Sequence, residues 1–445
     1  MNKSRFIEFV NDYILKMFTG SEIVGEEVSS PRDNCVAQGE SGGIKIKFTR
    51  EDNYRLLIKR AQPFKNFEIH LVKFIMEEMG KVLKLGLSDE YKVGLEDLII
   101  EKAICKSLTN SSSKTISLLL SELGYWGQRT YEGKHTTIGF IVTRKKQGNK
   151  TNPNLHISKF LTKDFAALLS DGENSFVEIS ADGYVSDYIY YSKQVDYNSY
   201  APYDNLKLAS LATGSKIGIC LNAQGEVLIF KNRSLLFAKR SGSWACFSHE
   251  EIVDKLSEHA GEYEDVRKAI YLSALDTSFN RSGGCIVHVN SGDSLNVLRH
   301  IDEADVLKKE SYDHIQQKKI DQSFFATPDS VNDIPEFDDF LTKEKCIKSA
   351  TINKLVAGRK FQEIDRKFRQ ELIAIDGATV IDYDGTILAV GAIIKIEAGS
   401  TGGGRLAAAK TLSNYGISIK ISNDGSMQGF KMDRNKLRAR TVFII

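Results

Sequence analysis

Short runs of alternating hydrophobic and polar residues dominate the middle of the chain, whereas the flanking regions carry longer stretches with helical spacing. Between Ser4 and Phe18 the apolar side chains recur every three or four residues, which predicts an amphipathic helix. The same spacing returns over 67–85 and over 95–123, while the strict alternation of Gly43–Thr49 predicts a strand. We therefore expect residues 1–125 to form a mainly helical N-terminal region.

Residues 126–249 have a different pattern, because short β-type runs follow one another with Gly, Asn and Asp between them. The pairs Asp182-Gly183 and Gln224-Gly225 are typical of hairpin turns. The runs, all rich in β-branched and aromatic residues, are TTIGFIVT (136–143), SFVEIS (175–180), YVSDYIYYS (184–192), KIGICLN (216–222), EVLIFKN (226–232) and SLLFAKR (234–240). This pattern predicts a β-rich middle region.

From residue 250 onward, helical and strand patterns alternate along the chain. A helical run, Glu250–Asn280, leads into Gly283–Val289, a mostly apolar stretch typical of a buried strand. A charged stretch of weak pattern at about 290–344 interrupts the alternation and is interpreted as an insertion. Residues 250–445 are therefore expected to form an α/β domain with a mixed central sheet flanked by helices, and the whole chain to be α+β.

Composition narrows the classes of function. The 445 residues include 60 Lys and Arg against 58 Asp and Glu, so net charge gives no reason to expect nucleic acid or an anionic membrane as partner. The six cysteines are widely spaced and form no CxxC pair, which argues against a zinc or disulfide framework. No run reaches the ~18 consecutive apolar residues of a membrane span. We expect a cytoplasmic protein with reduced thiols.

Two segments of the C-terminal region carry candidate chemistry. The first is Asp376-Gly377-Ala378, at the entrance of a predicted strand. The second opens a predicted helix and consists of Gly399, Ser400, Thr401, Gly402, Gly403, Gly404 and Arg405. Glycine amides can approach an anion closely, a helix N-terminus adds positive charge, and Arg405 can fork onto phosphate oxygens. The second segment is thus a candidate phosphate cradle, with a plain surface turn as the alternative; it is neither a Walker A loop nor GxGxxG.

The order of these segments resembles the diadenylate cyclase domain family of the DisA N-terminal type. The hallmarks of that family are DGA, a downstream GTRHRAAxxLS and a strand that ends in SEE. Here DGA is intact at 376–378, the second motif is GGRLAAAKTLS at 403–413, and the third is Ser422-Asn423-Asp424. The resemblance covers 266–445 and is clearest over 373–425.

The resemblance implies roles for individual residues. Asp376 would hold a metal and act in catalysis if the protein turns over ATP, with Mg²⁺ or Mn²⁺ as cofactor in that case. Ile394 belongs to Ile394-Lys395-Ile396, which stands where the family has a base-contacting Leu-Pro-Leu. Asp424 is what remains of the acidic pair, and Arg405 with its glycines would hold the phosphates of a nucleotide or cyclic dinucleotide.

The departures from the family pattern predict binding without catalysis. The family's Arg-His-Arg has become Arg405-Leu406-Ala407, and no histidine occurs after His314. Each lost charge-assisted phosphate contact costs ~1.5–3 kcal/mol, and transition-state contacts can cost more. We therefore expect a degenerate nucleotide sensor of a prokaryotic signalling or defence system, with an effector protein that the sequence does not identify.

Two alternatives remain open from the sequence. One is an active cyclase that makes cyclic di-AMP from two ATP molecules. Since such an enzyme must place two ATP sites face to face, the resemblance points to a homo-oligomer. The other alternative is a ligand-free module for protein interaction.

A further motif, Gly292-Asp293-Ser294-Leu295, follows a predicted strand and matches the nucleophile motif of GDSL esterases. Such an enzyme also needs a downstream Asp-x-x-His to supply the base and the group that orients it, and this chain has none. The sequence therefore favours Asp293 and Ser294 as the N-cap of a helix.

Overall fold

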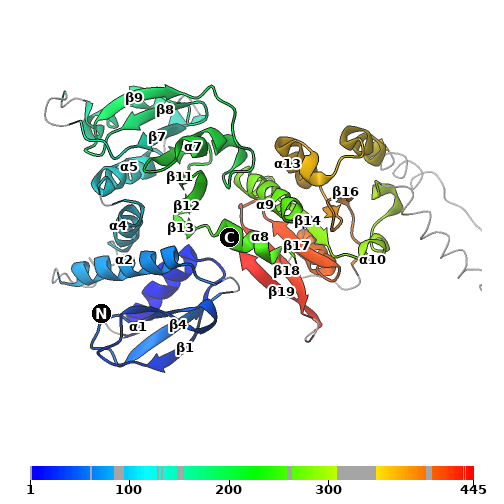
Figure 1. Cartoon of the computed structure of the whole chain (residues 1–445), viewed down its shortest axis with the longest axis horizontal. Helices are drawn as coiled ribbons and strands as arrows, with labels where there is room; N and C mark the ends of the chain where they lie inside the picture. The colour runs from blue at the N-terminus through cyan, green and yellow to red at the C-terminus, as the bar shows by residue number, and fades with distance from the viewer. Residues whose placement is uncertain are drawn as a thin grey trace, which may run out of the picture. The chain divides into compact units, whose positions relative to one another are not determined.

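The computed structural model of this chain (Figure 1) describes residues 3–60, 63–84, 95–109, 111–127, 130–131, 134–147, 152, 155–257, 263–307, 347–396, 403–433, 435 and 437–445. The chain forms two compact units, one of Met1–His249 with Ile445 and one of Glu250–Ile444. Both units combine helices with sheets, so the predicted α+β class is confirmed.

The first sixty residues contain the predicted helix and a small antiparallel sheet. Helix α1 (Lys3–Phe9) continues as a π-helix, η1 (Val10–Leu15), with Phe6, Phe9 and Ile14 buried. The sheet has the order β1-β4-β3-β2, and its strands are β1 (Glu22–Val28), β2 (Val36–Gln38), β3 (Ile44–Ile46) and β4 (Tyr54–Lys59). Of these strands the alternating pattern predicts β3 alone. The helical N-terminal region therefore also contains a sheet.

Three longer helices complete this region, namely α2 (Asn66–Leu83), α4 (Glu96–Leu108) and α5 (Ser113–Trp126). Figure 1 shows α2 running across the sheet of β1 and β4. The periodic stretch 95–123 is two helices, because the chain leaves the helical conformation at Thr109. The Ser112 hydroxyl donates to the Thr143 carbonyl at 3.1 Å, which ties this break to the next sheet.

The β-rich middle region is confirmed as a seven-stranded sheet of order β13-β12-β11-β10-β7-β8-β9. Only β7 and β8 are parallel within it. Its strands are β7 (Ile138–Val142), β8 (Ser175–Ile179), β9 (Val185–Tyr190), β10 (Ile217–Leu221), β11 (Val227–Lys231), β12 (Ser234–Arg240) and β13 (Ser243–Cys246). Gly183 and Gly225 occupy the two predicted hairpin turns with φ of 88° and 73°, a conformation that favours glycine.

Short elements connect these strands, and one hydrophobic core serves the whole unit. The connecting elements are β5 (Thr130–Tyr131), β6 (Lys134–His135), α6 (Ile157–Phe160), η4 (Asp164–Leu168), η5 (Tyr203–Asn205) and α7 (Leu206–Leu211). A single buried cluster extends from Phe6 to Cys246, so the helical and the β-rich regions share their core.

The unit Glu250–Ile444 is built on a six-stranded mixed sheet of order β16-β15-β14-β17-β18-β19, with β14 and β15 parallel. Its elements are α8 (His249–Lys255), α9 (Glu264–Phe279), β14 (Gly284–Val289), α10 (Ser294–Leu298), η6 (Glu303–Asp305), a helix at 347–356, η7 (Phe361–Glu363), α13 (Arg366–Ala374), β15 (Ala378–Ile381), β16 (Ile387–Ala392), α14 (Gly404–Leu412), β17 (Gly416–Ile421), β18 (Met427–Asp433) and β19 (Arg438–Ile444). Most of the predicted insertion, 308–346, lies outside the described residues.

Helices cover both faces of this sheet, as expected. Alternate residues of β14 face opposite sides. Cys285 and Val287 belong to a core cluster with residues of α10 and α14. Gly284 faces α13 so closely that a Cβ there would lie 2.6 Å from the Ile373 carbonyl oxygen. The sheet is therefore packed between α9 and α13 on one face and α10 and α14 on the other.

A buried ion pair joins α9 to α13. The Arg366 guanidinium donates from Nε and Nη2 to the two carboxylate oxygens of Asp276 at 2.7 and 2.8 Å. Both side chains are almost completely buried, with 1% and 0% exposed. The bidentate geometry fixes the relative position of the two helices that support β14 and β15.

Replacing Asp276 with Asn should destabilise this unit by about 3–5 kcal/mol, because it removes the charge that compensates a buried guanidinium. Hydrogen exchange of α9 and α13 peptides, read by mass spectrometry, measures the loss as faster exchange. Lys360→Gln, which breaks the exposed Lys360–Asp384 pair, is the control and should cost less than about 1 kcal/mol. Equal exchange in both variants would contradict the structural role of the buried pair.

Candidate functional site

Two glycines in contact shape the segment that carries Asp376. Gly377 has φ of 108°, and a Cβ there would lie 2.4 Å from the Gly391 carbonyl carbon. Gly391 has φ of 60°, and its Cβ would lie 2.6 Å from Cγ2 of Ile375. Only glycine fits at both positions, so the start of β15 and the end of β16 approach closely. Asp376 is exposed beside this contact.

The second candidate segment begins α14. Gly403 is the N-cap of this helix with φ of 84°, and Arg405 lies in its first turn. Nη1 of Arg405 donates to Oδ1 of Asn423 at 2.9 Å. Gly283 leaves room for this pair, because a Cβ there would lie 2.5 Å from that Nη1. The guanidinium is thus held beside the helix N-terminus.

These two segments meet at one cavity of about 580 Å³. Its lining comes from β14, β16, β17, α14 and the helix at 347–356, and consists of Cys285, Lys348, Asp376, Gly377, Gly391, Ala392, Ile393, Ile394, Ile396, Gly403, Gly404, Arg405, Leu406, Ala408 and Lys420. The volume lies within the range of small-molecule sites. Asp376, Gly377, Ile394, Gly403, Gly404 and Arg405, all predicted from the sequence, therefore share one site.

Lys348 and Asp305 form a wall that the sequence analysis does not predict. Nζ of Lys348 donates to Oδ1 of Asp305 at 2.6 Å and to the Gly391 carbonyl at 2.8 Å. The other oxygen of the fully buried Asp305 accepts the Ile393 N–H at 3.0 Å. This network holds the end of β16 and places a cation at the cavity. Neither residue belongs to a motif, and 43 positions separate them, so no sequence signal indicates the pair.

The charges that line the cavity favour an anion. Lys348 is paired with Asp305, so two further cationic side chains, Arg405 and Lys420, face one carboxylate, Asp376. Amides at the start of α14 and the positive end of its dipole add to this field. The cavity therefore has a modest excess of positive charge.

Cys285 also lines the cavity but is a poor nucleophile. Its side chain is fully buried, and burial raises the pKa of its thiol to about 12, although the nearby Arg405 acts in the opposite direction. The thiol therefore stays protonated at neutral pH, whereas the thiolate is the reactive form.

The remaining predicted residues lie elsewhere. The Asp424 carboxylate accepts from the N–H and the hydroxyl of Ser426, both at 2.8 Å, in the turn between β17 and β18. These hydrogen bonds hold the pKa of Asp424 below its ordinary value. Ala378 is buried in β15, so its side chain belongs to the core. Thr401 and Gly402 lie outside the described residues.

The GDSL-like segment has no catalytic geometry. Asp293 is at the N-cap position of α10, but its side chain makes no capping hydrogen bond. The Ser294 hydroxyl instead donates to Asp382 at 2.6 Å. Both ring nitrogens of the neighbouring His288 face carbonyl oxygens, those of Leu256 and Tyr383, at 2.9 and 3.2 Å. This histidine is therefore not placed to accept a proton from Ser294.

Comparisons with protein-family models, curated proteins and solved structures give no match to this chain. In the part of the chain that the structure describes, no three His, Cys, Asp or Glu side chains are grouped as a metal site. Among the described helices, none is both long and apolar enough to cross a membrane. A functional interpretation therefore depends on the geometry of the cavity.

Substituting Gly391 with Ala should destabilise the β15–β16 pair by about 1–3 kcal/mol, since a Cβ at φ of 60° would clash with Ile375. The measurement is hydrogen exchange of peptides that span these strands. Gly404→Ala is the matched control, because a Cβ there meets nothing within 4 Å and alanine favours a helix. Loss of protection in the control alone would be inconsistent with the glycine contact.

Proposed function

We propose that the unit Glu250–Ile444 is a nucleotide sensor, a diadenylate-cyclase-like domain that has lost catalysis. Its cavity binds a nucleotide or cyclic dinucleotide, and occupancy is passed to an effector protein of a prokaryotic signalling or defence system. The observation that carries this proposal is the convergence of Asp376-Gly377 and Gly403-Gly404-Arg405 on one cationic cavity. The proposal places the protein in the cytoplasm, where thiols stay reduced.

The lining residues suit the two halves of a nucleotide. The amides at Gly403 and Gly404 and the Arg405 guanidinium would hold phosphate oxygens. Ile394 and Ile396 offer an apolar wall against which a base can pack. Phosphates are the anions that best use both the rigid fork of arginine and a helix N-terminus.

Asp376 suits Mg²⁺ or Mn²⁺ as part of a nucleotide complex. Mg²⁺ is usually held by one or two carboxylates together with substrate phosphates and waters. Asp376 is an exposed carboxylate on the same cavity as the candidate phosphate cradle, so it fits that arrangement. A metal held by Asp376 would supply positive charge that reduces the repulsion between this carboxylate and the phosphates.

The side chains that follow Arg405 support binding rather than condensation. Leu406 contributes apolar surface to the cavity where the resembled family has histidine, and Ala407 is buried where it has arginine. Neither side chain can donate a hydrogen bond or carry charge. A pyrophosphate leaving group would therefore lose two of its stabilising contacts.

Incubation of the protein with ATP and Mg²⁺ or Mn²⁺ should yield no cyclic di-AMP, because the grip on the leaving group is missing. Mass spectrometry of the products tests whether cyclic di-AMP is formed. Accumulation of cyclic di-AMP would overturn the sensor proposal in favour of an active cyclase, which would also be expected to self-associate.

Arg405→Ala should weaken nucleotide binding by roughly 10- to 150-fold, which corresponds to the loss of ~1.5–3 kcal/mol from a charge-assisted hydrogen bond. Calorimetric titration with ATP, ADP, cyclic AMP and cyclic di-AMP measures this change in affinity. Lys410→Ala is the control, because this lysine is exposed on the same helix and does not line the cavity. Absence of heat with every nucleotide would favour a ligand-free interaction module instead.

A further inference from the structure

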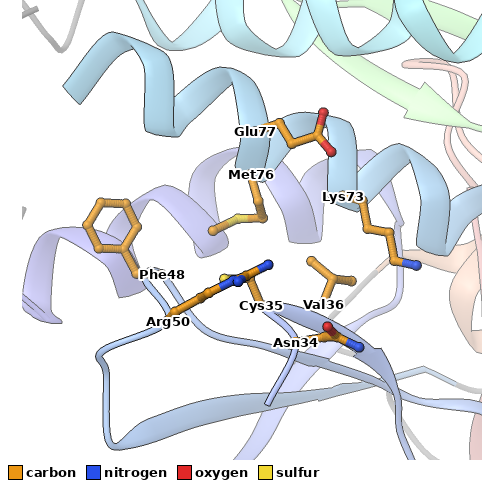
Figure 2. A pocket seen from close by; sticks show the side chains of 8 residues that line it. All are labelled: Asn34, Cys35, Val36, Phe48, Arg50, Lys73, Met76 and Glu77. Carbon is orange, nitrogen blue, oxygen red and sulfur yellow. The ribbon is translucent and has the colours of Figure 1, made fainter. Parts of the chain in front are cut away.

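A second cavity lies in the unit Met1–His249, between helix α2 and the small antiparallel sheet (Figure 2). Its volume is about 410 Å³, within the range of small-molecule sites. The sequence segments that form it are 34–36, 48–50 and 73–77, none of which belongs to the candidate nucleotide site. Its chemistry therefore needs a separate explanation.

Cationic side chains enter this cavity from two elements. Arg50, on the loop after β3, and Lys73, on α2, are both exposed lining residues, and Figure 2 shows the Arg50 guanidinium near Cys35 and the Lys73 ammonium on the other side of Val36. Among the residues that the structure describes, neither cationic group is within ion-pair distance of a carboxylate; the one lining carboxylate, Glu77, forms no ion pair with Lys73. In Figure 2 Glu77 lies farther from the strands than Met76 does. Two cations therefore face the cavity without neutralisation.

A buried lysine holds the loop that carries Arg50. Lys47 is 0% exposed, and its Nζ donates to the Ser30 carbonyl at 2.7 Å and to the Arg50 carbonyl at 2.9 Å. These bonds fix the backbone of Arg50 before any ligand arrives, which reduces the entropy cost of binding.

The interior of the cavity is apolar. Val36 and Met76 are 4% and 7% exposed, and Figure 2 shows them between the strand and the helix, with Phe48 beside them. Met76 is unbranched and can adjust to ligands of different shape. The cavity thus combines a hydrophobic floor with two cations.

We infer that this cavity binds a small organic anion, in which a carboxylate or phosphate head meets Arg50, a short apolar tail packs on Met76 and Val36, and Lys73 adds positive charge at the opposite side. The guanidinium fork matches both head groups, because each offers two oxygens in one plane. A cationic molecule of the same size would be repelled by Arg50 and Lys73, and a neutral one would gain no attraction from them, so both would bind more weakly.

Cys35 provides a reporter inside this cavity. Its thiol lines the site and is partly exposed. By contrast, burial raises the pKa of the Cys105, Cys220 and Cys246 thiols above the ordinary value, so they react slowly, as does Cys285. Cys346 lies outside the described residues, and peptide mapping separates its products from those of Cys35.

The test compares alkylation of Cys35 by iodoacetate, a small carboxylate, with alkylation by its neutral isostere iodoacetamide. In both reactions the thiolate sulfur displaces iodide, so the ratio of the two rates reports recognition of the anion rather than thiol ionisation. Arg50→Gln should lower this ratio by about tenfold, the effect of one charge-assisted hydrogen bond. Arg32→Gln is the matched control, because Arg32 is exposed and does not line the cavity. Its ratio should equal that of the unsubstituted protein.

Competition tests the apolar tail and the choice of head group. Hexanoate and hexyl phosphate, each at millimolar concentration, should protect Cys35 from iodoacetamide, and hexylamine should not. Protection by both anions would support recognition of either head group. Protection by one alone would identify that head group, carboxylate or phosphate, as the one that the cavity binds. Equal protection by hexylamine, no protection by either anion, or an unchanged rate ratio in Arg50→Gln would overturn the proposal.

Discussion

The buried pair between Asp276 and Arg366 is the interaction on which the candidate nucleotide site depends. Two opposite charges taken out of water are tolerated only when their geometry is good, and here both carboxylate oxygens accept from one guanidinium. The pair fixes α9 against α13, and both helices pack on β14. In the sheet, β14 lies between β15 and β17 and pairs with both. The position of Asp376, at the start of β15, is thus supported by an interaction away from the cavity.

The cavity is shaped by glycines that allow backbone segments and Arg405 to approach closely. Gly377 meets Gly391, and Gly283 leaves space for Arg405, so three positions without a Cβ determine where the charged groups lie. The cations then come from three separate parts of the chain. The proposed anion site therefore does not depend on a run of cationic residues after Arg405.

Sequence patterns predicted the elements that depend on residues close together in the chain. Buried strands such as β14 and hairpin turns at Gly183 and Gly225 follow from hydrophobic runs and turn chemistry, and the start of a helix at Gly403–Arg405 follows from the same local patterns. The patterns did not indicate β1, whose sequence EIVGEEV is mostly exposed and carries charges. They also missed Lys348 and Asp305, because a pair 43 positions apart depends on the tertiary fold.

The Asp305–Lys348 pair has a consequence for how distant parts of the chain form the cavity. The chain leaves the wall of the cavity at Asp305 and returns to the same point at Lys348, so the segment between them is closed at its base by an ion pair. The entropy cost of closing a loop rises only slowly, by ≈ 0.6 kcal/mol for each doubling of its length. The cost of bringing Asp305 and Lys348 together therefore depends little on the number of residues between them, so distant parts of the sequence can share one wall of the cavity.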